Sequence, residues 1–216
     1  IDDNVRVELG KSTREAGESS FNALDAACVD LEQGLIDVLV TAPINKDNIQ
    51  SEHFNFPGHT EYLAKRFKTD NYVMLMVSET MKIGVVTTHM PLSEVAKSIT
   101  KEAVLSKLRI IARSLEQDFS INKPRIAVFG LNPHAGDNGL LGNEENDVIL
   151  PAIIQAKKEG IIALGPYPAD GFFGSEDYRK FDAILAMYHD QGLIPFKMPS
   201  FEHGVNYTAG LQIIRP

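Results

Sequence analysis

The sequence has few of the features that mark several classes of protein. Its single cysteine, Cys28, excludes an internal disulfide framework. Lysine and arginine number 21 against 29 aspartate and glutamate, which gives a net charge of -8, and no basic stripe could follow a phosphate backbone. No apolar run is long enough to span a bilayer, and Ile1 to Asn4 lack the character of a signal peptide. We therefore expect a cytoplasmic protein with no nucleic-acid or membrane partner.

The remaining composition is that of an ordinary globular protein. Hydrophobic residues make up 44% and charged residues 23% of the 216 residues, enough for one large domain or two small ones. Cys28 follows Leu24-Asp25-Ala26-Ala27, which suits a buried helix face. We interpret this cysteine as a core residue and not as a nucleophile.

Apolar runs alternate with stretches of helical spacing. Runs with little polar alternation, which predict strands buried on both faces, occur at 37–41, 72–77, 83–88, 125–131, 182–188 and 212–215. Helical patterns occur at 20–33, 60–67, 100–118 and 144–158. Ser19 or Ser20 is a candidate cap for the first helix, and Thr100 for the third. This alternation predicts a layered α/β domain with a largely parallel or mixed sheet.

Residue types that carry chemistry follow several of these predicted strands. In such sheets, ligands bind beyond the carboxyl ends of the strands. Such ends are occupied by residues 41–46, His89, Asn132, His134, His189 and Asp190. We therefore expect one rim of the sheet to gather most of the reactive side chains.

Three histidines in unusual local contexts are candidate metal ligands: His59 after Pro57-Gly58, His134 after Asn132-Pro133, and His189 after Met187-Tyr188. Imidazole is a frequent ligand, and three nitrogens favour zinc, with magnesium, manganese, cobalt and nickel as alternatives. His89 is a candidate for orienting a ligand or substrate. The alternative interpretation is three hydrogen-bonded core histidines, because they form no local spacing motif.

A glycine-rich stretch and two cations are further candidates. Residues 136–142 lie where a phosphate-binding turn would, but they match neither nucleotide fingerprint, so we interpret them as scaffold for His134. Lys197 and Arg215 emerge from apolar surroundings and together suit a carboxylate or a phosphate. Alternatively, Lys197 only extends into water and Arg215 only ends an apolar run.

Six short segments carry a resemblance to a known family. They are Ala42-Pro43-Ile44-Asn45-Lys46, Pro57-Gly58-His59-Thr60-Glu61, Thr88-His89-Met90-Pro91-Leu92, Asn132-Pro133-His134-Ala135-Gly136, Met187-Tyr188-His189-Asp190-Gln191-Gly192 and Gly204-Val205-Asn206. In order and approximate spacing, they resemble the 4-hydroxythreonine-4-phosphate dehydrogenase family over nearly the whole chain. Asn45 stands where that family usually has histidine. Family members extend beyond both ends of the match, so we expect a member without its terminal segments.

The resemblance implies an NAD-dependent, divalent-metal-dependent dehydrogenase of vitamin B6 biosynthesis. Family members oxidise 4-phosphooxy-L-threonine at C3, and loss of carbon dioxide then gives 3-amino-2-oxopropyl phosphate. The implied site residues are His59, His134 and His189 as metal ligands and Lys197, Asn206 and Arg215 as substrate contacts. In the family, histidines from both chains of a homodimer complete one metal centre. Lys197 would pair with substrate charge or carry a proton, and Asp190 would orient an imidazole or accept from the substrate.

The implied fold is the layered α/β/α fold of isocitrate and isopropylmalate dehydrogenases, here mostly the smaller dimerisation and substrate domain. In that fold, the first and last segments of the chain make the larger, cofactor-binding domain. We therefore expect residues 1–216 to be the central metal- and substrate-binding and dimerisation region, with the cofactor-binding domain largely absent. The chain should then fold, dimerise and bind metal without turning over NAD alone.

Two other interpretations stay open. A paralogue with the same metal chemistry would oxidise another phosphorylated hydroxy acid, such as a threonate or erythronate phosphate. A more distant alternative is a metal-dependent hydrolase or lyase without a nicotinamide step, or a non-catalytic dimerisation module built on the same sheet.

Overall fold

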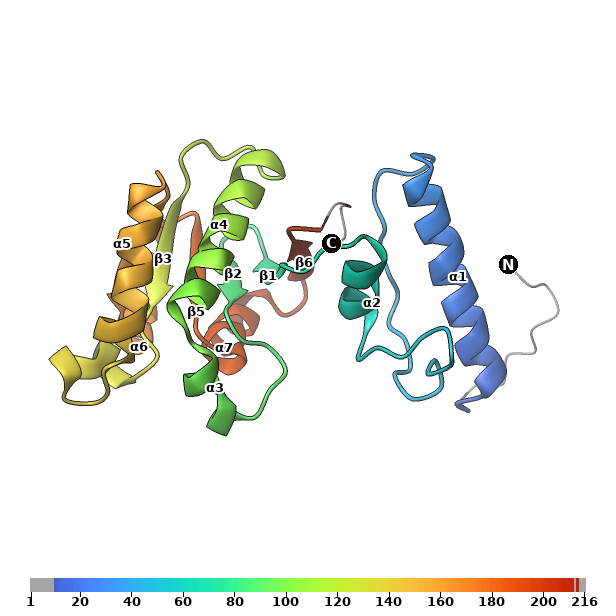
Figure 1. Ribbon diagram of the computed structural model, residues 1–216, viewed down its shortest axis with the longest axis horizontal. Helices are drawn as coiled ribbons and strands as arrows, with labels where there is room; N and C mark the ends of the chain where they lie inside the picture. Colours follow the sequence, from blue (N-terminus) through green and yellow to red (C-terminus); the bar gives the residue numbers. More distant parts are fainter. Residues whose placement is uncertain (1–9, 212, 214–216) are drawn as a thin grey trace. The chain divides into compact units, whose positions relative to one another are not determined.

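The computed structural model describes residues 10–211 and 213, which belong to two compact units. The helical unit comprises residues 1–70 and 211–216, and the sheet unit comprises residues 71–210 (Figure 1). Within the described ranges, no helix combines the length and the apolar character that crossing a membrane requires.

The sheet unit is built on a six-stranded mixed sheet with the order β4-β3-β5-β2-β1-β6. Its strands are β1 (Val73–Val77), β2 (Lys82–Val85), β3 (Arg125–Phe129), β4 (Ile162–Tyr167), β5 (Ala183–Ala186) and β6 (Val205–Ala209). Strands β4, β3, β5 and β2 are parallel, whereas β1 is antiparallel to both of its neighbours, β2 and β6. Strand β6 therefore points in the same direction as β5.

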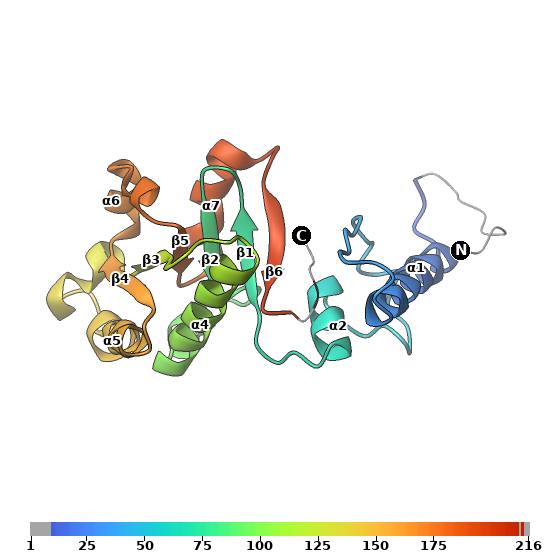
Figure 2. The same ribbon diagram turned by 90° about the horizontal axis from the view of Figure 1, so that it is seen from above.

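Helices cover both faces of this sheet. The helices α4 (Lys101–Gln117) and α5 (Leu150–Lys158) lie on one side, and α6 (Ala169–Gly174) and α7 (His189–Ser200) on the other (Figure 2). The short α3 (Leu92–Ser98) adds apolar side chains to the α4 layer. This arrangement confirms the predicted layered α/β/α fold.

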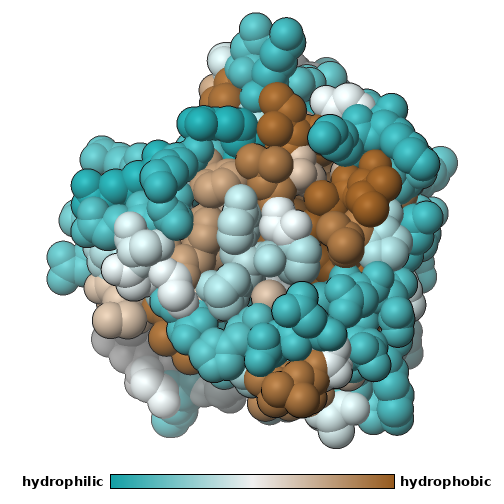
Figure 3. Space-filling model, turned by 90° about the vertical axis from the view of Figure 1, so that its left-hand side faces the viewer, coloured by the Kyte–Doolittle hydropathy of each residue, from teal (hydrophilic) through white to brown (hydrophobic). Residues whose placement is uncertain are grey.

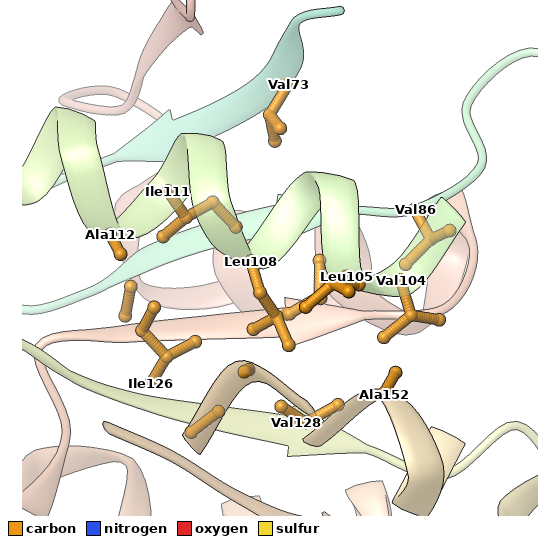
Figure 4. Packing of buried hydrophobic residues seen from close by; sticks show 14 of the residues in the cluster. Val73, Val86, Val104, Leu105, Leu108, Ile111, Ala112, Ile126, Val128 and Ala152 are labelled. Carbon is orange, nitrogen blue, oxygen red and sulfur yellow. The ribbon is translucent and has the colours of Figure 1, made fainter. Parts of the chain in front are cut away.

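Residues of each central strand alternate between the two apolar layers. In β3, Ile126 and Val128 pack in the layer of α4, whereas Ala127 and Phe129 pack in the layer of α6 and α7. Figure 4 shows Leu108 of α4 directed toward Ile126 and Val128. Because both faces are buried, the central strands appear in the sequence as continuous apolar runs.

The helical unit consists of α1 (Arg14–Glu32), α2 (His59–Arg66) and the irregular chain between them. Its apolar cluster includes Phe54, Leu63 and the fully buried Cys28. Burial raises the pKa of the Cys28 thiol to about 11, so the residue is a neutral thiol at physiological pH. This confirms Cys28 as a core residue.

Most predicted elements are confirmed within a few residues, but the first helix begins earlier than expected. It starts at Arg14, and its cap is Thr13, whose hydroxyl accepts a hydrogen bond from the Ala16 N–H at 3.3 Å. Ser19 and Ser20 lie inside the helix, so neither caps it. Thr100 does cap α4, accepting from the Ala103 N–H at 3.1 Å.

The sequence was wrong about one predicted strand, because among residues 37–41 only Val38 makes an isolated bridge. The predicted helix 144–158 is confirmed, and its first part is a π-helical turn, η2 (Glu145–Ile149), which continues directly into α5. The predicted strand 212–215 lies outside the described residues except for Ile213, which is in a bend. Strands β4 and β6 and helices α3, α6 and α7 were not predicted.

Candidate functional site

Three histidines follow the carboxyl ends of three adjacent parallel strands. Strand β5 lies between β2 and β3, and the chain continues from β2 to His89, from β5 to His189 and from β3 to His134. Pairing of β2 with β5 extends to Thr87, whose N–H and hydroxyl donate to the Met187 carbonyl at 3.1 and 2.8 Å. The loops that carry these histidines therefore all leave the sheet at the carboxyl ends of its parallel strands, which we call the rim.

His89 and His189 lie side by side at this rim. Their ring centroids are 5.6 Å apart, and both rings line a pocket of about 210 Å³. Nδ1 of His189 is 2.7 Å from Oδ1 of Asp190. A carboxylate in that place holds the ring orientation and leaves Nε2 for a ligand, as at many metal sites.

His134 lies in a left-handed turn, η1 (Pro133–Gly139), and is exposed. Its φ is +54°, and Ala135, Asp137 and Asn138 also have positive φ values, of +52°, +41° and +56°. Each non-glycine residue in this region costs about 1–2 kcal/mol, so the surroundings must hold the turn in place.

A buried carboxylate anchors the start of this turn. Glu145 is only 2% exposed, and its Oε1 accepts from the N–H groups of Leu131 and Asn132, both at 2.7 Å. Its Oε2 accepts from Nδ2 of Asn132 at 3.0 Å. A Cβ at Gly136 would lie 2.6 Å from Oε2 of Glu145, so glycine is required there both for its φ of +79° and for this close contact. Sequence periodicity showed Glu145 only as part of a helix.

Glu144 makes a second, weaker attachment to the same asparagine. Its Oε2 accepts from Nδ2 of Asn132 at 2.7 Å, and this hydrogen bond is the main cause that lowers the pKa of Glu144. Asn132 is therefore fixed through its backbone and through its side chain, immediately before the turn that carries His134.

Two predicted substrate contacts lie at the other end of the sheet. Strand β5, helix α7 and strand β6 form a crossover connection. Helix α7 therefore runs from the rim, where the histidines lie, back to the amino ends of the parallel strands. Lys197 is eight residues beyond His189 on α7, on the order of 12 Å along the helix axis. Asn206 lies near the start of β6, paired with Met76. Both side chains are exposed.

The remaining predicted site residues are not in the sheet unit. His59 is the first residue of α2 in the helical unit. Arg215 lies outside the described residues. Among residues 10–211 and 213, no group of three or more His, Cys, Asp or Glu side chains is close enough to hold a metal ion.

Sequence analysis assigned His89 only a supporting role, whereas the structure places its ring against that of His189. The two rings are neighbours because β2 pairs with β5 in parallel. The position of His89 after a predicted strand was visible in the sequence, but the order of the strands in the sheet was not.

Comparison with known proteins finds relatives in one enzyme family. A family model described as "Pyridoxal phosphate biosynthetic protein PdxA" matches residues 1–216. The 4-hydroxythreonine-4-phosphate dehydrogenase of Bacteroides thetaiotaomicron is 55% identical over 215 residues, covering 99% of this chain and 59% of the relative. That of Sulfurihydrogenibium sp. is 44% identical over 212 residues, covering 98% and 65%.

A solved structure gives the same result for the fold. The crystal structure of 4-hydroxythreonine-4-phosphate dehydrogenase from Klebsiella pneumoniae matches with a TM-score of 0.88 at 36% identity, covering 97% of this chain and 63% of that one. The chain therefore spans less than two thirds of the length of each of these relatives.

Replacement of Glu145 tests whether its carboxylate holds the turn. Glu145→Ala should lower the free energy of unfolding by about 2–4 kcal/mol, because two partly buried backbone N–H groups lose their acceptor. Glu145→Gln keeps one acceptor oxygen and should lose about half as much. Urea unfolding followed by circular dichroism measures both. Glu144→Ala is the control and should cost less than about 1 kcal/mol; equal losses for Glu144→Ala and Glu145→Ala would contradict the assignment.

Proposed function

Because the chain belongs to the family of the pyridoxal phosphate biosynthetic protein PdxA, we propose that the whole protein is a 4-hydroxythreonine-4-phosphate dehydrogenase. It oxidises 4-phosphooxy-L-threonine at C3 with NAD and a divalent metal, and loss of carbon dioxide gives 3-amino-2-oxopropyl phosphate. The observation that carries the proposal is the pair of His89 and His189 beside Asp190 at the rim of the sheet. The names of the relatives support the substrate.

The donor set at the rim fits a divalent cation, zinc before magnesium, manganese, cobalt or nickel, because imidazole nitrogens suit zinc best. We propose that His89 and His189 of one chain hold it together with His134 of the partner subunit. His134 is exposed on a rigid turn, as a ligand offered to another chain should be. His59 stays a prediction from the resemblance, and His89 takes its place in this proposal because its ring lies against His189.

When bound, a divalent cation would supply Lewis acidity toward the substrate hydroxyl, and NAD would supply the hydride acceptor. The chain supplies the remaining groups. Asp190 orients His189, and because 66% of its side chain is exposed, its second oxygen can accept a hydrogen bond from the substrate. Lys197 and Arg215 supply positive charge for the substrate phosphate and carboxylate, and Asn206 supplies an amide donor.

Residues 1–216 form the central metal- and substrate-binding and dimerisation region in this proposal. The cofactor-binding domain lies largely in the additional length that the relatives possess, which leaves the nicotinamide contacts unassigned on this chain. The greater length of the relatives supports this division, because the chain covers 59% and 65% of the two relatives named above.

The proposed homodimer shares its active site, and the two surfaces of α7 support it. Leu193 and Phe196 are buried against the sheet, whereas Ile194, Met198 and Phe201 are 59%, 82% and 78% exposed. A helix that is apolar on both faces is normally buried on both. The turn η1 with His134 packs against α6, on the same side of the sheet as α7. A second copy on this side would therefore meet His134.

The ligand set is tested by measuring zinc affinity in a competition titration with a chromophoric chelator. His89→Ala and His189→Ala should each weaken zinc binding by more than about 100-fold, because loss of an outer partner of a ligand alone costs about 10–100-fold. His53→Ala is the control, since His53 stacks on Phe21 in the helical unit. If His59→Ala removes zinc and His89→Ala does not, the proposed exchange of ligands is wrong.

The dimer surface is tested by sedimentation velocity of two charge-introducing variants. Met198→Glu should convert the dimer to a monomer, because a carboxylate cannot be buried without a partner. Leu164→Glu should leave the dimer intact. Leu164 is 43% exposed on the edge strand β4, at the end of the sheet unit where Figure 3 shows other apolar side chains at the surface. The opposite pattern would place the interface at that edge.

Calorimetry on the zinc-loaded chain tests the substrate. 4-Phosphooxy-L-threonine should bind more tightly than threonate or erythronate phosphate. Lys197→Ala should weaken its binding about 10- to 100-fold, because a charged hydrogen bond contributes about 1.5–3 kcal/mol. Lys158→Ala, at an exposed position on α5, is the control. Tighter binding of a hydroxy acid phosphate would favour the paralogue, and NAD reduction by the 216-residue chain would contradict the proposed division of domains.

A further inference from the structure

The side chain of Gln191 joins the two strands that lead to His189 and His134. Its Oε1 accepts from the Met187 N–H at 2.7 Å, and its Nε2 donates to the Gly130 carbonyl at 2.7 Å. The regular pairing of β3 with β5 ends at Val128 and Leu185. The amide of Gln191 therefore supplies a further link between these strands, just where the two chains separate toward their histidines.

A simpler role for Gln191 would be that of a helix cap. It is the third residue of α7, and glutamine or glutamate in the first turn commonly accepts from an N–H group just before the helix. The bond to Met187 fits that role, and a glutamate would serve it equally well. The bond to Gly130 does not, because it reaches another strand and requires an N–H donor. Only one orientation of the amide satisfies both partners.

Gly130 transmits this contact to the turn of His134. A Cβ at Gly130 would lie 2.8 Å from Cα of Ala135, so the backbone of residue 130 packs directly on the turn. The next two N–H groups are held by Glu145. The start of the turn is thus fixed from two sides, by Glu145 and by Gln191, and Gln191 is itself two residues beyond His189.

We propose that Gln191 is a positioning residue, which fixes the His134 turn relative to α7 and His189 so that a divalent cation can be bound. The proposal rests on the metal site proposed above and adds a residue that does not touch the cation. Because α7 also carries the proposed dimer surface, the same amide sets where His134 is presented to a partner.

Two variants, Gln191→Glu and Gln191→Met, test this role through the binding of cobalt and zinc. Both should bind the cations about 10- to 100-fold more weakly than the unmodified chain, which is the usual effect of losing an outer partner. The visible absorption of bound cobalt should also change, because its ligands are displaced. Gln191→Glu keeps the acceptor for Met187 and loses only the donor to Gly130. Its added negative charge would by itself tighten cation binding, so weaker binding identifies a geometric effect.

Gln155→Glu is the matched control, because Gln155 makes a surface hydrogen bond to Glu159 on α5. It should bind cobalt as the unmodified chain does, with the same spectrum. The role of Gln191 is overturned if both Gln191 variants bind cobalt as tightly as the unmodified chain. If the unmodified chain itself binds neither cobalt nor zinc, the metal site falls and this inference falls with it.

Discussion

The candidate site depends on the place of β5 between two parallel neighbours. Its pairing with β2 continues through the Val86 N–H, which donates to the Ala186 carbonyl at 2.9 Å, and its pairing with β3 fixes the opposite side. A slip of one residue would turn Ile184 from one apolar layer to the other, so burial specifies the register strongly. That register brings histidines from distant parts of the sequence to one rim.

The rim contains strained backbone and a buried charged side chain, unlike the apolar layers on the two faces of the sheet. Four non-glycine residues of the turn η1 have positive φ, at about 1–2 kcal/mol each. The three hydrogen bonds of the Glu145 carboxylate, at about 1.5–3 kcal/mol each, are of the same order. A strained turn and a buried carboxylate thus hold each other in place. Such local strain is typical of sites that must present a side chain rigidly.

The sequence predicted the elements whose patterns are decided locally. Strands β1, β2, β3 and β5 are continuous apolar runs, and α4 has both a cap and an apolar stripe. Strand β4 is an edge strand that contains Gly165-Pro166, and α7 contains Pro195 and Pro199, so neither resembles its element in the sequence. The run 37–41 was misread, because within the described residues it forms no strand and only Val38 makes a bridge.

The site was predictable to a similar extent. The predicted strand ends identified the rim as the site and His134, His189 and Asp190 as candidate residues. The contact between His89 and His189 depends on the order of strands in the sheet, which cannot be derived from one sequence. Glu145 and Gln191 were missed for the same reason. Their partners are backbone groups of other segments, and nothing in the local sequence of a glutamate or a glutamine indicates such a partner.

The crossover from β5 through α7 to β6 places a further constraint on any reaction at this rim. This crossover carries the chain away from His189, so Lys197 and Asn206 lie toward the amino ends of the parallel strands, away from the rim. The substrate proposed above would need both an imidazole-bound metal and a positive charge for its phosphate, and this separation keeps the two apart within one chain. In the proposed dimer, with two copies related by a two-fold axis on the α6 and α7 side, Lys197 of one copy would lie toward the histidines of the other. The topology supports the proposed dimer in this way, because it separates groups that one substrate would need together.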